Sequence, residues 1–311
     1  MSILVTGAAG FIGYHLCQRL LKEGNLVIGI DNMNNYYDVE LKKSRLNQLN
    51  EIKHFTFEKI DISDKKSLNK IFKLYNPNKV VNLAAQAGVR YSIENPYAYV
   101  DSNLVGFINI IEMCRNYNIE NLVYASSSSV YGGNKKFPFS TDDRVNKPLA
   151  LYGATKRANE LIAHSYSHLF GLHSTGLRYF TVYGPWGRPD MAMFIFTRKI
   201  INDEPIPVFN NGKMKRDFTY IDDIISGTIS AIEKNHKCEI FNLGNNKSED
   251  LMDMIRLIEK SLDKKAIIDF QPIQPGDVLE SFADIEYSKQ KLNYKPYTDI
   301  SKGIPKMIDW Y

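Results

Sequence analysis

Residues 3–22 read ILVTGAAGFIGYHLCQRLLK, and this stretch decides the fold of the chain. It opens with a short apolar run, Ile3 to Val5, of the kind that forms a buried parallel strand. Glycines follow at positions 7, 10 and 13, and apolar residues then recur every four positions, as they do on one face of a helix. A strand, a glycine-rich turn and a helix together form the unit that receives the pyrophosphate of a dinucleotide.

Each of the three glycines has a separate role in such a unit. Gly7 allows the tight turn, Gly10 lets the backbone approach a phosphate without an intervening Cβ, and Gly13 lets the helix pack closely against the strand. The helix N-terminus adds free N–H donors and the positive end of its dipole. This spacing alone is a weak indication, because ordinary tight turns also contain glycine.

The second strand supplies independent support. Residues 26–30 form another apolar run, and Asp31 follows it directly, 18 residues beyond Gly13. A carboxylate near this position accepts hydrogen bonds from both ribose hydroxyls and repels a 2′-phosphate. Because the next residue is Asn32 and not arginine, we expect NAD rather than NADP.

Composition places the chain among globular proteins and narrows its partners. The 311 residues are 44% hydrophobic, enough for one large domain or two closely associated ones, and the net charge of +4 is spread along the chain, so nucleic acid is not expected. Neither a membrane span nor a signal peptide is expected, because no apolar run is long enough and the chain starts with a strand. The three scattered cysteines (Cys17, Cys114 and Cys238) indicate reduced thiols in the cytoplasm.

Strands and helices alternate along the first part of the chain. We expect strands at 55–57, 79–85, 122–125 and 174–179, helices at 65–75, 96–117 and 151–170, and an exposed loop with a short helix at 32–51. This alternation predicts an α/β fold with a Rossmann-type, doubly wound parallel sheet. Ligands of such sheets bind at the carboxyl ends of the strands, where we expect Asp31, Asp61, Ala84, Ala85 and the serines at 126–129 to meet.

The character of the chain changes at Gly184. Residues 184–189 read GPWGRP, and the segments 184–216 and 246–311 hold shorter elements interrupted by Pro, Asn and Gly. We expect these two segments to form a smaller mixed α/β lobe that binds the substrate. Residues 1–183 then form the NAD-binding domain, to which residues 217–245 return.

The main catalytic candidates are Tyr152 and Lys156, four residues apart and therefore on one face of a helix. A phenol with a pKa near 10 is a poor base at neutral pH, but a nearby ammonium and a cationic nicotinamide are expected to lower that pKa. The phenolate then takes a proton from a substrate hydroxyl while hydride leaves the same carbon, and Ser127 relays the proton. A lone YxxxK is common in helices. It becomes specific when it follows the glycine motif, an NAD-type acid and a serine at a strand end.

These motifs resemble those of the extended short-chain dehydrogenase/reductase family, and within it the NAD-dependent nucleotide-sugar epimerases, over essentially the whole chain. The residues that carry the resemblance are TGAAGFIG (6–13), the NxxG at 103–106, SSSSVYGG (126–133), LYGATKRANE (151–160), RYFTVYGPWGRPDMA (178–192), RDFTYIDDI (216–224), FNLGN (241–245) and QPGDV (274–278). The last five motifs are most similar to those of UDP-glucuronate 4-epimerases. Thr181 and Gln274 depart from UDP-galactose epimerases, which typically carry Asn and Arg there.

The resemblance implies a set of site residues, of which Ser127, Tyr152 and Lys156 are the catalytic ones. The residues expected to contact NAD are Gly7, Gly10, Phe11, Ile12, Gly13, Asp31, Asn32, Asp61, Ile62, Leu83, Ala84, Ala85, Ser102, Tyr152, Lys156 and Tyr179. The residues expected to contact a UDP-sugar are Arg90, Ser129, Thr181, Arg188, Val208, Phe209, Arg216, Gln274 and Asp277. Arg90 and Arg188 suit a sugar carboxylate or the diphosphate, because a guanidinium binds either in a bidentate manner.

The implied activity is 4-epimerisation of a UDP-sugar, with UDP-glucuronate to UDP-galacturonate favoured. A transient 4-keto intermediate turns within the pocket, takes the hydride back on its opposite face and leaves NAD regenerated. Alternatives are a UDP-glucose or UDP-N-acetylglucosamine 4-epimerase, a UDP-glucuronate decarboxylase and, outside enzymes, an NAD-bound sensor or scaffold. A 4,6-dehydratase is disfavoured, because Ser128 and Ser129 stand where dehydratases carry an Asp–Glu pair.

Two further expectations concern assembly and metals. The resemblance implies a homodimer through the helices at 96–117 and 151–170, the first of which carries an apolar pattern that includes Val100, Phe107 and Ile108. No metal is expected, because the one histidine pair at helical spacing has no third ligand nearby.

Overall fold

The centre of the molecule is a parallel β-sheet. The structure, a computed structural model, describes residues 1–274 and 277–311, so Pro275 and Gly276 of the QPGDV motif lie outside the described residues. Seven strands form the sheet in the order β11-β6-β5-β4-β1-β2-β3, and every neighbouring pair is parallel. Their bounds are β1 (Ser2–Thr6), β2 (Leu26–Asp31), β3 (Phe55–Lys59), β4 (Lys79–Asn82), β5 (Asn121–Ser127), β6 (Ser174–Tyr179) and β11 (Cys238–Leu243). The expected doubly wound sheet is confirmed.

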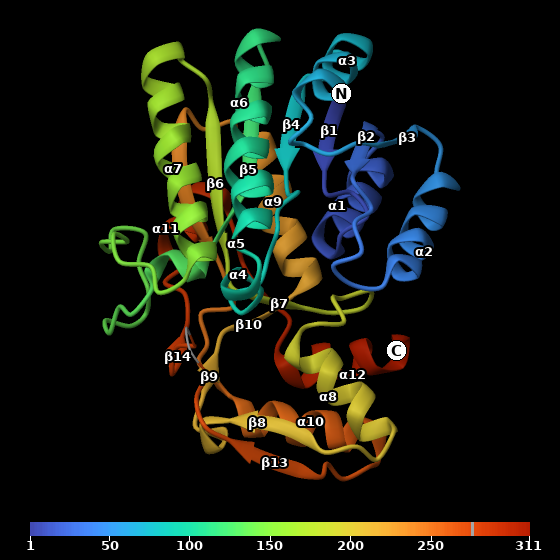
Figure 1. Cartoon of the computed structure of the whole chain (residues 1–311), viewed down its shortest axis with the longest axis vertical. Coiled ribbons are helices and arrows are strands. Elements are labelled where there is room, and N and C mark those ends of the chain that lie inside the picture. Colours follow the sequence, from blue (N-terminus) through green and yellow to red (C-terminus); the bar gives the residue numbers. More distant parts are fainter. Residues whose placement is uncertain (275–276) are drawn as a thin grey trace.

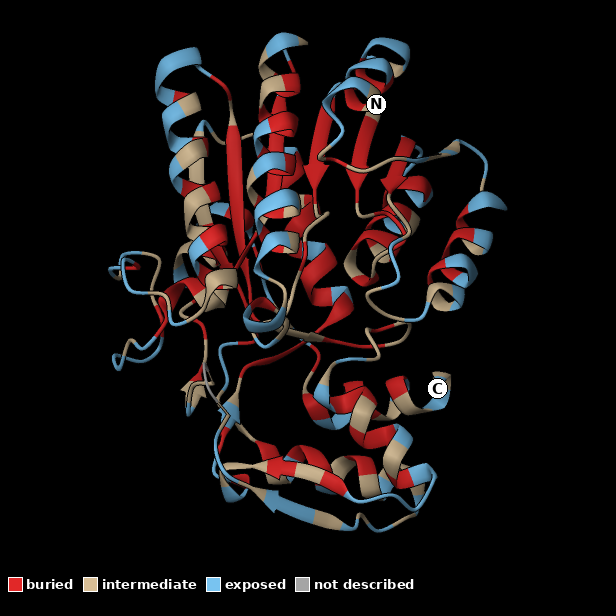
Figure 2. Ribbon diagram, in the orientation of Figure 1, coloured by how far each residue is buried: buried red, intermediate tan, exposed pale blue. Residues whose placement is uncertain are grey.

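Both faces of the sheet are covered by helices, which explains why its strands are apolar runs. Within β1, Ile3 and Val5 belong to one hydrophobic core and Leu4 belongs to the other. The first core includes α1 (Phe11–Lys22), α2 (Val39–Asn50) and α9 (Ile221–Lys234), and the second includes α3 (Lys65–Tyr75), α6 (Gly106–Asn116) and α7 (Leu151–Phe170). Figure 1 shows α6 and α7 side by side over β5 and β6, and Figure 2 shows the strands between the helix layers as buried.

Local capping explains why α3 has the expected bounds. The Asp64 carboxylate accepts hydrogen bonds from the backbone N–H groups of Lys66 and Ser67, as an N-cap residue does. At the other end Asn76 adopts a left-handed conformation with φ of 40°, and Pro77 follows it. The prediction of a helix at 65–75 is confirmed to the residue.

The expected helix at 96–117 is interrupted. It consists of α5 (Pro96–Tyr99), a π-helical segment, η1 (Val100–Val105), and α6. The π-helical segment contains Asn103, whose amide side chain accepts from the N–H of Gln86 and donates to its carbonyl oxygen at 2.9 and 3.0 Å. A π-helical turn thus accompanies a buried polar contact with the loop that follows β4.

The strand expected at 79–85 is shorter than predicted, because β4 ends at Asn82. The N–H of Ala84 donates to the Thr6 hydroxyl at 2.9 Å, so a side chain replaces a neighbouring strand as its partner. The residues after Asn82 therefore leave the sheet and pass beside the glycine turn. The short α4 (Tyr91–Glu94) follows this loop.

The lobe lies beyond the carboxyl ends of the sheet and faces them (Figure 1). Three short elements of the large-domain segments border the lobe, namely η2 (Ser128–Tyr131), β7 (Thr181–Tyr183) and β10 (Phe218–Tyr220). The elements of the lobe segments are α8 (Ala192–Ile201), β8 (Ile206–Phe209), η3 (Asn210–Gly212), β9 (Lys215–Arg216), β12 (Glu249–Asp250), α10 (Leu251–Leu262), β13 (Ile268–Gln271), β14 (Glu280–Ser281) and α12 (Ile300–Trp310). The strands β8 and β13 pair in parallel, β9 pairs with β12 and β14, and β7 with β10. One hydrophobic core continues from the sheet into the lobe.

One part of the segment 246–311 packs on the large domain instead of the lobe. The helix α11 (Glu286–Leu292) contacts α9 and β11, and the Ser288 hydroxyl donates to the carbonyl oxygen of Asn242 at 2.7 Å. The Tyr294 hydroxyl donates to the carbonyl oxygen of Gly244 at 3.0 Å. The expected division of the chain therefore differs from the structure here, because buried hydroxyls dock this stretch beside the last strand of the sheet. Over the described residues, no helix is long and apolar enough to cross a membrane.

Candidate active site

A cavity of about 860 Å³ opens between the carboxyl ends of the sheet strands and the lobe. The following expected site residues line it: Gly7, Gly10, Phe11, Ile12, Gly13, Asp31, Asn32, Asp61, Ile62, Leu83, Ala84, Ala85, Arg90, Ser102, Ser127, Ser129, Tyr152, Lys156, Tyr179, Thr181, Arg188, Phe209, Arg216 and Asp277. Segments far apart in the sequence thus meet at the edge where a parallel sheet binds its ligands.

Val208 and Gln274 do not line this cavity. Val208 is fully buried in the hydrophobic core, and its neighbours Pro207 and Phe209 face the cavity instead. Successive side chains of a strand point to opposite faces, so the contact expected at 208 belongs to the residues on either side. Gln274 is the last residue of the described range 1–274, and it is not among the residues that line the cavity.

The glycine turn forms a cradle that side chains would fill. Gly7 has a φ of +70°, and a Cβ there would lie 2.9 Å from the backbone nitrogen of Ala84. A Cβ on Gly13 would lie 2.0 Å from the carbonyl oxygen of Gly7, so all space between turn and helix is used. Gly10 caps α1 without any side-chain hydrogen bond, which leaves the first N–H groups of the helix for an anion. This arrangement fits the pyrophosphate of a dinucleotide.

Asp31 ends β2 beside this turn and is nine-tenths buried. Burial raises the pKa of its carboxyl group, while the N–H of Met33 and the positive charge of Lys42 oppose that effect. Asp61 lies two residues after the end of β3, and one of its oxygens accepts from the Asn32 side chain at 2.7 Å. Ser63 donates to its other oxygen. The two acids and Asn32 thus form the polar wall that suits the adenosine half of NAD.

Arg45 is a residue of this region that sequence reasoning missed. The segment 32–51 was expected to be exposed, and that expectation is wrong for the inner face of α2, where Arg45 is fully buried. Its guanidinium donates to the carbonyl oxygens of Ala9, Trp186 and Gly187 and to the Tyr37 hydroxyl, at 2.6 to 3.1 Å. One arginine therefore joins the glycine turn to the loop 184–192. An arginine in a run of Asn, Tyr and Lys carries no signal of this in the sequence.

Ser127, Tyr152 and Lys156 line the same part of the cavity. Ser127 is the last residue of β5, and its hydroxyl accepts from the N–H of Ser129 at 3.1 Å. Tyr152 and Lys156 lie on the first turns of α7, and Tyr152 packs edge-on against the ring of Tyr99 at 6.1 Å. A strand end and a helix start therefore present the three groups to one space.

The protonation of these groups differs in one respect from the expectation. Burial raises the pKa of Tyr152, although the Ser127 hydroxyl and the Arg188 charge both act to lower it. Lys156 is itself buried, and burial lowers the pKa of its ammonium to about 8. In the protein groups alone, burial therefore outweighs the effects that lower the pKa of Tyr152. The expected lowering of this pKa also requires the nicotinamide and stays a prediction. The positive charge of a nicotinamide next to the phenol would act in the required direction.

A buried ion pair lies next to Ser127 and joins α7 to β5 and β6. The Glu160 carboxylate on α7 accepts two hydrogen bonds from Arg178 on β6, at 2.8 and 2.9 Å, and one from Ser126 at 2.6 Å. Arg178 is 2% exposed and also donates to the Tyr131 hydroxyl at 3.0 Å. The pair fixes α7 against the ends of β5 and β6, immediately beside Ser127.

The lobe side of the cavity is basic and aromatic. Arg90, from the loop after β4, donates to Asp277 at 3.2 Å and lies 4.5 Å from the centre of the Phe209 ring. Arg216 lies close enough to Asp277 and Arg90 for their charges to affect its pKa, which is lowered by burial. Two arginines, an acid and an aromatic ring suit a nucleoside diphosphate.

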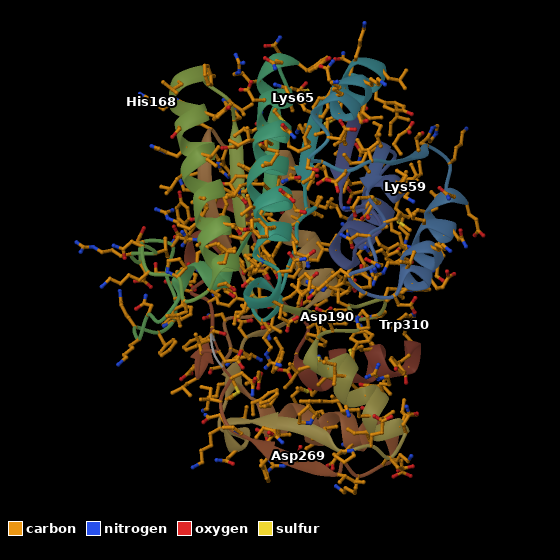
Figure 3. The ribbon with its side chains drawn as sticks, in the orientation of Figure 1. Lys59, Lys65, His168, Asp190, Asp269 and Trp310 are labelled. Carbon is orange, nitrogen blue, oxygen red and sulfur yellow. The ribbon has the colours of Figure 1, made fainter. Side chains whose placement is uncertain are left out.

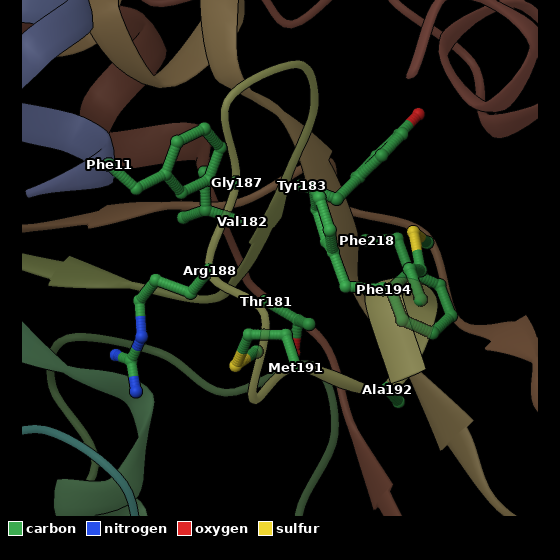
Figure 4. A pocket seen from close by; sticks show the side chains of 11 residues that line it. Phe11, Thr181, Val182, Tyr183, Gly187, Arg188, Met191, Ala192, Phe194 and Phe218 are labelled. Atoms are coloured by element: carbon green, nitrogen blue, oxygen red, sulfur yellow. The ribbon is translucent and has the colours of Figure 1, made fainter. Parts of the chain in front are cut away.

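The loop 184–192 carries the third arginine of the cavity. The Arg188 guanidinium is paired with the Asp190 carboxylate through Nε, at 3.0 Å, and through Nη2. Asp190 also accepts a hydrogen bond of 3.2 Å from the Tyr36 hydroxyl. Figure 3 shows Asp190 at the junction of the large domain and the lobe, and in Figure 4 the Arg188 side chain points away from the rings of Tyr183, Phe194 and Phe218. Those rings line a second, small cavity of about 30 Å³ behind the loop.

Metal-binding groups do not contribute to this geometry. Within residues 1–274 and 277–311, no three His, Cys, Asp or Glu side chains form a cluster that suits a metal ion. The three cysteines are free thiols, and Cys17 and Cys114 are buried.

The fold and the site define a dinucleotide-binding protein whose cavity is lined by a serine, a tyrosine and a lysine. Residues 3–244 match the family model described as "NAD dependent epimerase/dehydratase family", and the chain belongs to this family. Its sequence is 46% identical over 329 residues to UDP-glucuronate 4-epimerase 4 of Arabidopsis thaliana, covering all of this chain and 75% of that protein.

Two solved structures are similar over their whole length. One is a UDP-glucuronic acid 4-epimerase from Bacillus cereus in complex with UDP-glucuronic acid and NAD, with a TM-score of 0.95, 37% identity and coverage of 100% and 98% of the two chains. The other is a UDP-glucose 4-epimerase from Thermotoga maritima with UDP-glucose, with a TM-score of 0.92, 30% identity and the same coverage. The expected family, the fold and the use of NAD are confirmed.

Proposed function

We propose that this protein catalyses the NAD-dependent 4-epimerisation of UDP-glucuronate to UDP-galacturonate. The observation that carries the proposal is that Ser127, Tyr152 and Lys156 share one cavity with Arg90, Arg188 and Arg216. A UDP-uronate has about three negative charges, two on the diphosphate and one on the sugar, which a cavity with several arginines suits. The similarity to UDP-glucuronate 4-epimerases at 46% and 37% identity supports the same substrate.

Each catalytic side chain has one task. When bound, NAD supplies an acceptor for the hydride of the sugar C4 and returns that hydride later. Tyr152 takes the proton of the C4 hydroxyl and gives it back, and Ser127 hydrogen-bonds the same oxygen. Lys156 supplies positive charge and holds ribose hydroxyls. Gly7, Gly10 and Asp31 hold the pyrophosphate and adenosine ribose.

Arg188 is the candidate for the sugar carboxylate. It lies near enough to the catalytic phenol for its charge to lower the pKa of Tyr152, whereas Arg90 and Arg216 lie with Asp277 and Phe209 on the lobe side. Oxidation at C4 makes the uronate a β-keto acid. Such an acid loses carbon dioxide when the bond between C5 and the carboxylate carbon lies perpendicular to the plane of the C4 carbonyl group. A guanidinium that fixes the carboxylate prevents that orientation.

The residues after β5 argue against the related eliminations and decarboxylations. Ser128 and Ser129 form the start of η2, and Ser129 lines the cavity where an acid–base pair would be required. Hydroxyl groups with high pKa values are poor acids and bases at neutral pH. A UDP-hexose epimerase remains the second candidate, supported by the likeness to the UDP-glucose 4-epimerase structure.

A product assay with three substrates tests the proposal. Purified protein is incubated with UDP-glucuronate, UDP-glucose and UDP-N-acetylglucosamine, and the products and any carbon dioxide are measured. We expect UDP-galacturonate from the first substrate without carbon dioxide, and deuterium placed at C4 retained in the product. Conversion of only the neutral sugars would move the assignment to the hexose epimerases, and carbon dioxide release would move it to the decarboxylases. Absence of turnover with all three substrates would favour the alternative that the protein is an NAD-bound sensor or scaffold.

We also propose that two copies associate through α6 and α7. Apolar side chains on the outer faces of these helices and η1 are exposed, namely Val100, Val105, Ile108, Leu161, Leu169 and Phe170. Phe107, expected in the same pattern, is buried against the sheet instead. Several exposed apolar side chains on neighbouring helices are typical of a protein interface. A cytoplasmic location, which the free cysteines support, completes the proposal.

A further inference from the structure

The ion pair between Arg188 and Asp190 leaves part of the guanidinium uncommitted. Asp190 occupies the edge formed by Nε and Nη2. A guanidinium has five N–H groups, so the edge formed by Nη1 and the second Nη2 proton can bind another carboxylate in a bidentate manner. Among the residues that the structure describes, Arg188 Nη1 has no hydrogen-bond partner. Both side chains line the large cavity.

The carboxylate of Asp190 is itself held from across the cavity. Its Oδ2 atom accepts from the hydroxyl of Tyr36, which is 154 residues away in the sequence. The Tyr36 ring packs against that of Tyr91 at a centroid distance of 4.8 Å and lies 5.9 Å below the Arg188 guanidinium. Asp190 is therefore held by both Tyr36 and Arg188, and its contacts with Nε and Nη2 orient the plane of the Arg188 guanidinium.

We propose that Asp190 is a positioning residue that sets the specificity of the cavity for an acidic sugar: it holds one edge of Arg188 so that the opposite edge faces the sugar carboxylate. This inference rests on the proposed function, in which the substrate is a UDP-uronate. Arg is among the side chains with the largest rotamer entropy, so an unrestrained Arg188 would lose freedom on binding. A neutral hexose makes no use of that edge.

The sign of the effect separates positioning from simple charge. If Asp190 acted only through its negative charge, its removal would strengthen the binding of every anionic UDP-sugar, most of all the uronate. If it acted only as a structural group, its removal would weaken the binding of all UDP compounds alike. If Asp190 positions Arg188, its removal weakens the binding of the UDP-uronate and leaves the binding of the other UDP compounds nearly unchanged.

The test compares NAD-loaded wild-type protein with Asp190→Asn, Tyr36→Phe and Asp253→Asn by calorimetric titration with UDP-glucuronate, UDP-glucose and UDP. Asp253 pairs with Arg256 on the surface of α10, outside the residues that line the cavity, and serves as the matched control. We expect Asp190→Asn to weaken UDP-glucuronate binding about tenfold. Tyr36→Phe should give a smaller loss in the same direction, with UDP-glucose and UDP changed less than twofold in both variants and no change in Asp253→Asn.

Two results would overturn the inference. One is UDP-glucuronate binding to Asp190→Asn as tightly as, or more tightly than, to wild type, and the other is an equal loss for all three compounds. The proposed function is judged separately by the turnover of the wild-type protein. A wild type that binds UDP-glucuronate but does not epimerise it contradicts the proposed function, while the binding comparison still decides the role of Asp190.

Discussion

The Nζ atom of Lys156 donates a hydrogen bond of 2.9 Å to the carbonyl oxygen of Ala125, two residues before Ser127. This contact ties α7 to the end of β5. Lys156 is 3% exposed, and burial lowers the pKa of its ammonium from 10.5 to about 8. Such a change corresponds to a free-energy cost of about 3 kcal/mol for the charged form in the folded protein.

The first prediction concerns stability against pH. Between about pH 8 and 10.5 the unfolded chain binds more protons at Lys156 than the folded one, so this group makes the free energy of unfolding rise with pH in that window. Below pH 8 both states carry the charge and the full cost remains. We expect the difference in unfolding free energy between wild type and Lys156→Met to shift by about 3 kcal/mol in favour of wild type from pH 7 to 10.5. Urea denaturation of NAD-free protein measures it, and a difference independent of pH would contradict the burial of the ammonium.

The second prediction separates chemistry from cofactor binding. Tyr152→Phe removes the phenol hydroxyl and keeps the ring that packs against Tyr99. We expect turnover to fall by about 10²–10⁴-fold, the usual contribution of general acid–base catalysis, while bound NAD remains at the wild-type level. Tyr99→Phe is the matched control, since that hydroxyl donates to the carbonyl oxygens of Ala87 and Gly88. Turnover of Tyr152→Phe close to that of Tyr99→Phe would remove the assignment of the base.

The third prediction compares a buried and an exposed ion pair. Glu160→Gln leaves the Arg178 guanidinium, which is 2% exposed, without its charged partner, so we expect a loss of about 3–5 kcal/mol in the free energy of unfolding. Asp253→Asn breaks the exposed pair with Arg256 on α10, away from the proposed dimer interface, and should cost below about 1 kcal/mol. Chemical denaturation of both variants gives the comparison. Equal losses would mean that the Glu160–Arg178 pair is not desolvated as the structure shows.

The fold was predictable because its signals are local. The glycine spacing after β1, the acid after β2 and the capping of α3 by Asp64 each lie within a few residues of the element that they define. That Ser127, Tyr152 and Lys156 line one cavity was predictable for the same reason, since a strand end and a helix start each specify where a side chain points. Their catalytic roles stay a prediction.

The departures from prediction arise from tertiary contacts. Residues 206–209 read IPVF, and four apolar residues in a row do not show which face of β8 points inward. In the structure Val208 is buried in the hydrophobic core. The burial of Arg45 depends on Trp186, 141 residues away, and the pairing of Arg90 with Asp277 spans 187 residues. No pattern within either segment encodes such a partner.

The fourth prediction tests the link made by Arg45. Arg45→Lys keeps the positive charge but replaces a planar group with five donors by one ammonium, which cannot reach Ala9 and Trp186 together. We expect NAD to dissociate about tenfold faster, because the carbonyl of Ala9 loses a charge-assisted hydrogen bond. Arg19→Lys, which changes an exposed pair with Glu23 on α1, is the control. Fluorescence of NADH bound to the two variants follows the release, and equal rates would show that the glycine turn does not depend on Arg45.

The fifth prediction concerns assembly. Ile108 on α6 is 37% exposed and Leu161 on α7 is 53% exposed, whereas Leu74 on α3 is 69% exposed on a helix outside the proposed interface. A carboxylate placed in a packed apolar interface is desolvated without a partner, so Ile108→Asp and Leu161→Asp should each make the protein monomeric at micromolar concentration. Leu74→Asp should leave it dimeric. Light scattering with the far-ultraviolet circular dichroism of each variant separates dissociation from unfolding. A wild-type protein that is already monomeric would exclude the interface. A folded Leu161→Asp variant that is still dimeric would place the interface elsewhere, since α6 and α7 lie in contact with each other.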